Sequence, residues 1–480
     1  MPEVDLFIDR DAELAELRAL ADRRAPAIAL LYGRRRVGKT YLLEHAWPDR
    51  RVFYFVAADA TPEINRKELI AELSGWSGQE LNPAEYPTWR TVFRLLADFA
   101  RKEQLIAVLD EFQYLMGGDD DIVSQLVAVF DRELCGRPLL LALSGSSVAM
   151  MESLVGGGQP LFGRSAWSAK IGPFDYRDAA RMAPGRSNRE VALLYGIFGG
   201  TPRYLAAIAP GEPLAEAVMR SMLSPRGEIY LQLEHVIEQE QGIRRPADYN
   251  SILRSIAAGD HEVTKIANRT GIDVMAVRAA LRTLADLEYV WKERNFDAPA
   301  KAAYQYRLAD NALAFWFRFV HANRSRLQTG AIRVVWQRQV EPQLNTYMGK
   351  VFERMCREAF QRYHADWGLA GATTWARWEG QDRNRRSIEI DAVARLDDGR
   401  ILVGEIKWSS KPVGPAVHTD LVRDLQDLAA SGHGWAREAL LPAQSAGYFF
   451  VSAAGFSPDM LQIVQTAPQV NGWTLDDLYR

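Results

Sequence analysis

The 480-residue chain has 58 lysine and arginine residues against 61 aspartate and glutamate residues, a formal net charge of −3. This balance excludes a protein that is basic over its whole surface, so contact with nucleic acid requires a local patch. The 48% hydrophobic and 25% charged residues are typical of folded globular proteins, and the length predicts several domains. The 2 cysteines have no metal-type spacing, the first residues do not resemble a signal peptide, and no apolar run is long enough to span a bilayer. We therefore expect a cytoplasmic protein without membrane contact.

A glycine-rich loop follows an apolar run near the start of the chain. Residues 28–32 predict a buried strand and residues 41–45 a helix, and the intervening sequence fits G-x-x-x-x-G-K-[ST]. The two glycines allow amide groups to turn inward around phosphate oxygens, and the helix adds its positive dipole end. Lys39 is expected to reach the β- and γ-phosphates of ATP, and Thr40 to ligate Mg²⁺. The predicted nucleotide contacts are Gly33, Arg34, Arg35, Arg36, Val37, Gly38, Lys39, Thr40 and Tyr41.

A second apolar run, residues 105–109, ends in two acids. In open α/β sheets, ligands bind at the carboxyl ends of the strands, which is where Asp110 and Glu111 would lie. Asp110 is predicted to hold Mg²⁺, and Glu111 to orient and polarise the attacking water. The alternative is a pair of surface carboxylates without a catalytic role. The complete phosphate loop in the same chain favours the magnesium site over this alternative.

A third buried strand, residues 139–143, is followed by small hydroxyl residues. Ser144 or Ser146 could sense the γ-phosphate, or could cap the next helix. The alternation of strands and helices predicts a parallel, doubly wound α/β sheet.

The middle of the chain has the element order of a winged helix. Helices are predicted over residues 249–258, 263–269 and 274–284, and wing strands over 290–294 and 304–308. Arg278 and Arg282 lie four residues apart and share one face of the third helix. They would suit phosphate contacts, but winged helices also serve as protein-contact modules, and both uses remain open.

A hairpin near the C-terminus brings acidic and basic residues together. Residues 387–394 predict a strand, 397–400 a turn and 400–408 the return strand. Alternation along the return strand places Glu405 and Lys407 on one face, and Asp391 lies near the equivalent position of the first strand. Two carboxylates and a lysine can hold a divalent metal and position a water molecule. The alternative is an exposed hairpin with a cross-strand ion pair. The basic run at residues 381–386 could grip phosphates or could be a solvated loop.

Several of these motifs resemble the archaeal-type ATPases, a prokaryotic branch related to STAND and AAA-like P-loop NTPases. The segments that carry the resemblance are residues 33–40, 109–113, 144–152, 160–164, 198–205, 306–310 and 315–319. The resemblance implies an ATPase core with a parallel doubly wound sheet (1–185), a helical lid (186–245), a winged helix (246–310), connecting helices (311–345) and a restriction-endonuclease-like α/β domain (346–480). It also implies that Pro202 contacts the nucleotide. Arg164 would stabilise charge on the phosphates, although an arginine at such a position is as often an ion-pair partner.

The C-terminal hairpin resembles the core of PD-(D/E)XK nucleases. This resemblance implies that Asp391 and Glu405 are metal ligands, that Lys407 lies beside the attacking water, and that Glu353 completes the site. The sequence has Glu389-Ile390-Asp391 where the first half of the motif usually has a proline.

The predicted function is that of an ATPase with ATP and Mg²⁺ as cofactors, coupled to a nucleic-acid-binding winged helix and a metal-dependent nuclease-like domain. DNA is favoured over RNA as the partner, and a homo-oligomer is left open. The alternative is a nucleotide-dependent switch or scaffold whose nuclease fold is catalytically silent.

Overall fold

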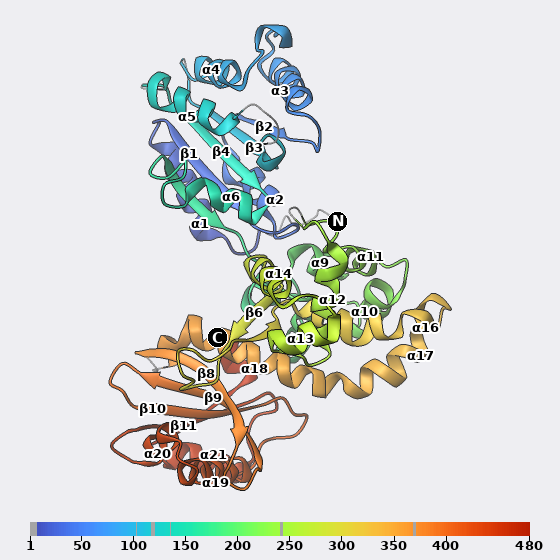
Figure 1. Ribbon diagram of the computed structural model, residues 1–480, viewed down its shortest axis with the longest axis vertical. Coiled ribbons are helices and arrows are strands. Elements are labelled where there is room, and N and C mark those ends of the chain that lie inside the picture. The colour runs from blue at the N-terminus through green and yellow to red at the C-terminus, as the bar shows by residue number, and fades with distance from the viewer. Residues whose placement is uncertain (1–6, 102, 117–120, 135, 241–242, 368–370) are drawn as a thin grey trace. The chain divides into compact units, whose positions relative to one another are not determined.

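The computed structural model describes residues 7–101, 103–116, 121–134, 136–240, 243–367 and 371–480 (Figure 1). They form two compact units. The first comprises Met1–Phe174, Thr201–Arg203 and Val236–Pro246, and the second Asp175–Gly200, Tyr204–His235 and Ala247–Arg480. Two short segments thus return to the first unit after the chain has left it.

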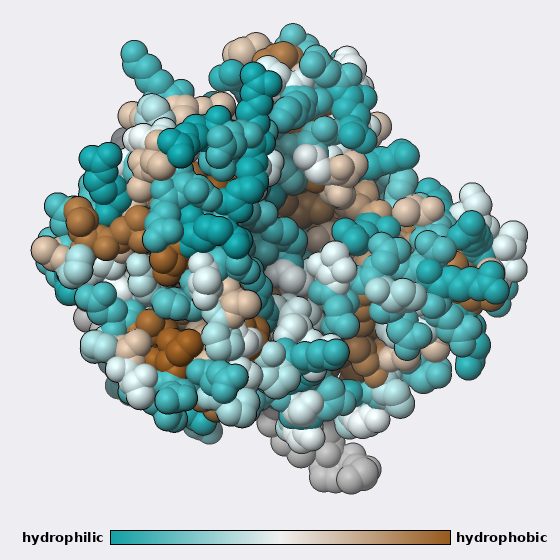
Figure 2. Space-filling view, turned by 90° about the horizontal axis from the view of Figure 1, so that it is seen from below, coloured by the Kyte–Doolittle hydropathy of each residue, from teal (hydrophilic) through white to brown (hydrophobic). Residues whose placement is uncertain are grey.

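The face of the molecule drawn in Figure 2 is mainly hydrophilic, and hydrophobic residues form separate patches on it. Large exposed hydrophobic side chains come from different parts of the chain, such as Phe162 in the turn before residues 165–170 and Met275 in the helix of residues 274–286. Scattered exposure of this kind is normal for a folded protein surface. Within the described residues, no helix has the length and hydropathy needed to cross a membrane.

The first unit is built on a five-stranded parallel sheet with the order β2-β3-β4-β1-β5. Its elements are α1 (Asp11–Asp22), β1 (Ala27–Tyr32), α2 (Lys39–Ala46), β2 (Val52–Val56), α3 (Pro62–Ser77), α4 (Trp89–Phe99), β3 (Leu105–Asp110), α5 (Ile122–Glu133), β4 (Leu139–Gly145), α6 (Val148–Val155) and β5 (Ser165–Lys170). The strands predicted over residues 28–32, 105–109 and 139–143 are confirmed as β1, β3 and β4, and β5 is an edge strand that was not predicted. Because β4 lies between β1 and β3, the end of β4 lies between the strand end that carries the phosphate loop and the strand end that carries the two acids.

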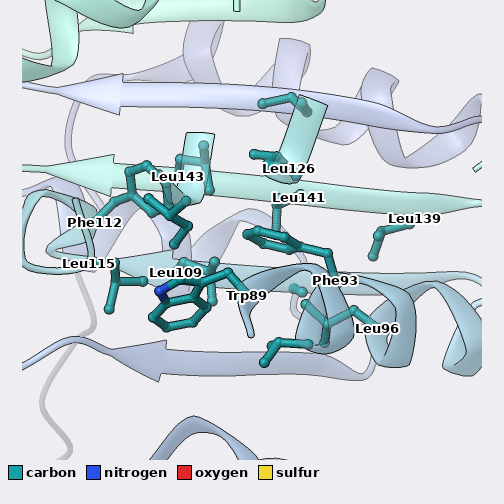
Figure 3. Packing of buried hydrophobic residues seen from close by; sticks show 14 of the residues in the cluster. Trp89, Phe93, Leu96, Leu109, Phe112, Leu115, Leu126, Leu139, Leu141 and Leu143 are labelled. Atoms are coloured by element: carbon teal, nitrogen blue, oxygen red, sulfur yellow. The ribbon is translucent and has the colours of Figure 1, made fainter. Parts of the chain in front are cut away.

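Alternate residues of these strands pack into two separate cores. On one face, Leu109 and Leu141 pack with Trp89 and Phe93 of α4 and with residues of α3, α5 and α6 (Figure 3). On the other face, strand residues such as Val108 pack against α1 and α2. Both faces of the central strands are therefore buried, which explains why these strands read as continuous apolar runs.

The second unit begins with helices and contains the predicted three-helix module. Its elements up to the last long helix are α7 (Tyr176–Arg181), α8 (Asn188–Phe198), α9 (Pro202–Ala206, whose first two residues belong to the first unit), α10 (Leu214–Val218), α11 (Glu228–Glu234), α12 (Pro246–Ala257), α13 (Val263–Thr270), α14 (Val274–Asp286), β6 (Val290–Glu293), β7 (Gln305–Leu308), α15 (Asn311–Phe315), α16 (Arg324–Gln328), α17 (Ile332–Val335) and α18 (Leu344–Tyr363). Strands β6 and β7 are antiparallel, and the Asp273 side chain caps α14 by accepting from Met275 N and Ala276 N. The helices and strands predicted for this segment are confirmed.

A second five-stranded sheet ends the chain, in the order β12-β11-β10-β9-β8. Its elements are β8 (Ala372–Gln381), β9 (Ser387–Leu396), β10 (Ile401–Lys407), α19 (Ala416–Ala430), α20 (Gly434–Leu440), β11 (Ser445–Ser452), α21 (Pro458–Thr466), β12 (Val470–Thr474) and α22 (Leu475–Leu478). β8, β9 and β10 are antiparallel, and β10, β11 and β12 are parallel. Helices α19, α20 and α21 bury one face of this sheet, and Phe360 of α18 packs on Trp375 of β8. The predicted hairpin of β9 and β10 is confirmed.

Strand β9 contains a β-bulge at the candidate site. Ile390 pairs with Trp378, and Val393 pairs with Ala376, so β9 has one residue more than β8 over this interval. Asp391 lies within the bulge. Bulges bend a strand locally and redirect side chains, and they are frequent next to functional sites.

Candidate functional site

The two glycines of the phosphate loop are required by the backbone. Gly33 donates its N–H to Gly145 O at 3.3 Å, and a Cβ on Gly33 would lie 2.1 Å from Ile171 O. Gly38 is the N-cap of α2 with φ of 94°, in the region that favours glycine. The loop therefore fits tightly between β4 and the residue after β5, and any side chain at Gly33 would push these apart.

Lys39 lies inside the loop. Its Nζ donates to Gly33 O at 2.9 Å and to Arg34 O at 3.1 Å, and the residue is only 5% exposed. Burial lowers the pKa of Lys39, and the nearby carboxylates of Glu111, Asp110 and Glu240 oppose this shift. The ammonium is thus held in place by neutral carbonyl groups, and a phosphate oxygen could replace them.

The two predicted magnesium ligands touch each other. Thr40 Oγ1 donates to Asp110 Oδ2 at 2.8 Å, and Tyr54 Oη donates to the same oxygen at 2.8 Å. Asp110 is 2% exposed, and burial together with this carboxylate raises the pKa of Tyr54. A hydroxyl and a carboxylate oxygen are ligands that suit Mg²⁺. Tyr54, which orients Asp110, was not predicted.

Glu111 is fixed by residues from two strand ends. Its φ of 54° is unusual for a residue other than glycine, and its Oε2 accepts from Ser146 Oγ at 2.7 Å and from Gln113 Nε2. Ser146 N in turn donates to Gln113 Oε1 at 3.2 Å. The Ser144 hydroxyl is buried without a hydrogen-bond partner among the described residues. The N-cap of α6 is Ser147, whose side chain makes no capping bond. Ser146 therefore positions the predicted catalytic carboxylate, and the capping alternative is not observed.

The three arginines of the loop bind different segments of the first unit. Arg34 Nη2 donates to Thr201 Oγ1 at 3.1 Å, next to the predicted contact Pro202. Arg35 donates to Tyr114 Oη at 3.0 Å, and Arg36 to Gln239 Oε1 at 2.6 Å. Val37 is buried, and Tyr41 is exposed and stacked on Phe7 with ring centroids 5.6 Å apart. These bonds tie the loop to residues 201–203 and 236–246, which explains why both segments belong to this unit.

Arg164 lies away from these residues in an exposed ion pair. Its Nη2 and Nε bond to the Asp131 carboxylate of α5 at 2.9–3.1 Å, and its Nη1 donates to Pro160 O at 3.0 Å. This is the ion-pair use that the sequence left open. A role in stabilising phosphate charge stays a prediction.

In the second unit, the structure brings Asp391, Glu405 and Lys407 together. Asp391 Oδ2 accepts from Ile406 N at 2.9 Å and from Lys407 Nζ at 3.0 Å, and Lys407 also pairs with Glu405. Burial, reinforced by Asp391, raises the pKa of Glu405 to about 8. Burial alone would lower the pKa of Lys407, but Asp391 and Glu405 raise it above its ordinary value. The lysine therefore acts as the counter-ion of two crowded carboxylates.

The oxygens of Glu353, Glu389 and Asp391 lie within 4.8 Å of one another, close enough to share a metal ion. Burial and Asp391 raise the pKa of Glu353. Lys350 Nζ bonds to Glu353 at 3.0 Å and to Glu389 at 2.8 Å. Three carboxylates are suitable ligands for a hard divalent cation. Glu389 was not predicted as a ligand, although its spacing of two from Asp391 on a strand indicated a shared face.

The β6–β7 hairpin packs on the edge strand β8. Phe296 N donates to Arg377 O at 2.8 Å, Glu379 N donates to Asn295 Oδ1 at 3.1 Å, and Gln305 Nε2 donates to Glu379 Oε1 at 2.9 Å. The hairpin expected to act as a nucleic-acid-binding wing thus covers a sheet edge, whereas Arg278 and Arg282 of α14 are exposed.

The basic run at residues 381–386 forms a tight turn. Arg386 pairs with Asp424 at 2.8 Å and with Asp427 at 2.7 Å. This arginine is therefore occupied by carboxylates of α19.

Comparison with known proteins agrees with the first of these sites. Residues 7–208 match a family model described as an ATPase domain predominantly from Archaea. This part of the chain is therefore similar to archaeal-type ATPase domains. Residues 316–417, which contain α18 and the β9–β10 hairpin, match a second family, described as archaeal and bacterial proteins of unknown function.

An uncharacterised protein of Methanocaldococcus jannaschii is 26% identical over 409 residues, which cover 84% of this chain and 88% of that protein. Among solved structures, the Walker-type ATPase of Pyrococcus abyssi is similar with 24% identity and a TM-score of 0.48, over 65% of this chain and 96% of that one. The ORC2 protein of Aeropyrum pernix is similar with 14% identity and a TM-score of 0.44, over 68% of this chain and 97% of that one.

Proposed function

We propose that the archaeal-type ATPase domain binds and hydrolyses Mg²⁺-ATP and thereby controls a metal-dependent site that cuts nucleic acid, DNA rather than RNA, in the second unit. The observation that carries the proposal is the convergence of Asp391, Glu405 and Lys407, with Glu353 beside them. Protein surfaces rarely bury several carboxylates together unless a cation compensates them.

The phosphate loop and the two acids would supply the main functions that phosphoryl transfer requires. Lys39 is placed to bind the β- and γ-phosphates, and Thr40 and Asp110 would hold Mg²⁺, which neutralises charge that develops on the phosphates. Glu111 is the base that orients the attacking water. Ser146 and Gln113 determine the direction of its carboxylate.

The carboxylate site supports hydrolysis of a phosphodiester. Asp391, Glu405 and Glu353 would hold the divalent ion, which supplies a water of lowered pKa. Lys407 would then lie beside the attacking water, and its positive charge would stabilise the negative charge that develops on the phosphate.

A specific observation favours a second candidate, a switch whose nuclease fold is silent. Each carboxylate of the site already has a protein cation, because Lys407 pairs with Asp391 and Glu405, and Lys350 with Glu353 and Glu389. Such internal pairing could stabilise the fold without any metal.

One experiment separates the two candidates. The purified chain is incubated with Mg²⁺ or Mn²⁺, with and without ATP, on single- and double-stranded DNA and RNA, beside the Lys39→Ala and Lys407→Ala variants. The proposal expects metal-dependent cutting that changes with ATP, is lost in Lys407→Ala, and loses its response to ATP in Lys39→Ala. Absence of cutting on every substrate, with ATP hydrolysis intact, would favour the silent switch. The same protein, examined for mass in solution with and without ATP, tests whether a homo-oligomer forms.

A further inference from the structure

A cavity of ≈ 300 Å³ lies in the second unit, between the three-helix module and α18. One wall comes from the end of α12 and from β6 and β7, and the other from α18, with Arg377 of β8 also in the lining. Every residue of the lining belongs to the second unit, so this cavity is separate from the ATP site. A volume of this size lies at the lower end of the range for small-molecule sites.

The lining of the cavity is strongly cationic. Its positive side chains are Arg307, Arg318, Lys350, Arg354, Arg357 and Arg377, against the two carboxylates Glu293 and Glu353. Burial, and then Arg307, lowers the pKa of His261 in the same lining, so the imidazole adds no charge at neutral pH. A cavity with an excess of positive charge attracts an anion.

Two of these cations lack a carboxylate partner. Within the part of the chain that the structure describes, Arg354 donates to the carbonyl of Leu308, and Arg318 donates to Gln343 Oε1 at 3.4 Å; neither pairs with an acid. By contrast, Arg307 and Arg357 both pair with Glu293, and Arg307 also lies 3.7 Å from Glu379. Arg377 pairs with Glu379 and Glu389, and Lys350 with Glu353 and Glu389. Six cations thus face four carboxylates. The positive charge of the cavity is therefore only partly compensated by the protein.

Unsatisfied hydrogen-bond donors gather on the same lining. Arg357 Nε, Arg377 Nε and Trp291 Nε1 are buried and have no acceptor among the described residues. The Arg357 guanidinium stacks on the Trp291 ring at 4.2 Å, which fixes both groups in one wall. All three atoms are hydrogen-bond donors, so a ligand that satisfies them has to supply acceptor oxygens. Buried donors without an acceptor destabilise the folded protein, and an acceptor that reaches them is bound correspondingly well.

We infer that this cavity binds a phosphate group carried by a ligand of about mononucleotide size. Phosphate oxygens are acceptors only, carry the charge that the lining lacks, and form strong bonds with arginine. Glu353 contributes to the cavity lining and to the group of three carboxylates, so the bound phosphate lies beside the candidate metal site. The phosphate comes from a free nucleotide or from the 5′-phosphorylated end of a strand.

Arg318 and Lys350 allow a test without damage to the core, because both are exposed at the cavity. The double variant Arg318→Gln/Lys350→Gln removes two charges from the lining. Arg326→Gln/Arg338→Gln removes two exposed charges outside the lining and serves as the matched control. All chains carry Lys39→Ala, so that the phosphate loop does not contribute, and binding is measured without divalent metal.

The probes are AMP with adenosine as its control, and a 3′-labelled thymidine hexamer with a 5′-phosphate or a 5′-hydroxyl. The inference expects phosphate-dependent binding that is weakened about tenfold or more in the double variant and unchanged in the matched control. Binding of AMP identifies a free nucleotide as the ligand, and binding of the phosphorylated hexamer alone identifies a strand end. Equal binding with and without phosphate, no binding of either phosphorylated probe, or equal affinity in the two double variants would overturn the inference. Neither ATP hydrolysis nor cutting enters this readout, so its failure is separate from failure of the proposed function.

Discussion

The phosphate-loop site and the carboxylate site differ in the groups that their lysine side chains contact. Lys39 is held by two backbone carbonyls, while Asp110 and Glu111 accept hydrogen bonds from neutral side chains. Lys407 instead lies directly on Asp391 and Glu405. A cation that binds the first site meets carboxylates without a salt bridge, whereas one that binds the second has to compete with an ion pair. Under the proposed function, Mg²⁺-ATP would bind the first site without breaking a salt bridge, whereas a metal ion would bind the second only if its ion pair opens.

The largest expected effect comes from the lysine of the first site. Lys39→Ala should reduce ATP hydrolysis to below about 1% of wild type and weaken ATP binding, because the charge contact to the phosphates is lost. Nucleotide binding and phosphate release measure the two effects, and the thermal melting temperature checks the fold. ATP binding at wild-type affinity in a folded Lys39→Ala protein would remove the basis of the comparison.

The corresponding change in the second site should have the opposite effect on its cation. Lys407→Ala leaves Asp391 and Glu405 without their counter-ion, so Mn²⁺ should bind more tightly, whereas cutting should fall about 100-fold or more. ATP turnover, measured on the same preparation, is the control and should be unchanged. Weaker Mn²⁺ binding in this variant would show that the lysine does not compete with the metal.

Glu111→Gln should slow hydrolysis about 100-fold and leave ATP binding intact, because the amide cannot act as the base. Ser146→Ala tests how Glu111 is positioned: it should lower kcat by less than Glu111→Gln and leave KM for ATP nearly unchanged. If Glu111→Gln hydrolyses ATP at the wild-type rate, Glu111 is not the base and another residue has this role.

Metal binding to the second site should increase with pH. The pKa of Glu405 is raised to about 8, so over the neutral range a metal ion competes for this group with a proton as well as with Lys407. Between pH 6 and pH 8, Mn²⁺ affinity should rise by up to about tenfold for each unit. Glu405→Gln should abolish this dependence, and a pH-dependence that persists in it would point to another group.

The smallest effect is expected on α14. Arg278→Ala/Arg282→Ala should weaken nucleic-acid binding almost equally for all sequences and reduce the slope of log K against log salt by up to about 2. Unchanged affinity and slope would assign this module to protein contact.

The fold of the first site could be predicted because local sequence determines it. The loop from Gly33 to Thr40 and the strand that ends at Asp110 are continuous motifs, and both strands are buried on two faces. Ser146 could not be assigned to Glu111 from the sequence, because its proximity depends on β4 pairing with β3. The edge strand β5 was missed because its half-exposed, alternating residues resemble a loop.

The second site could be predicted only in part. The hairpin and its alternation identified Asp391, Glu405 and Lys407, but the bulge in β9 has no local signature. Glu389 was missed because its neighbours Glu353 and Lys350 come from α18, whose approach to the sheet is set by packing such as that of Phe360 on Trp375. The cationic cavity between the three-helix module and α18 could not be predicted either, since its walls come from segments far apart in the chain.

Calorimetric titration of Mn²⁺ into the full chain without nucleotide tests most directly whether the second site holds a metal. Asp391→Asn preserves the size of the side chain and removes the charge that is central to the site, and Asp424→Asn on α19 is a control outside it. We expect a binding heat that is present in wild type and in Asp424→Asn and is lost in Asp391→Asn. Equal heats in wild type and Asp391→Asn would contradict this expectation and leave the carboxylates and Lys407 as a structural ion-pair network.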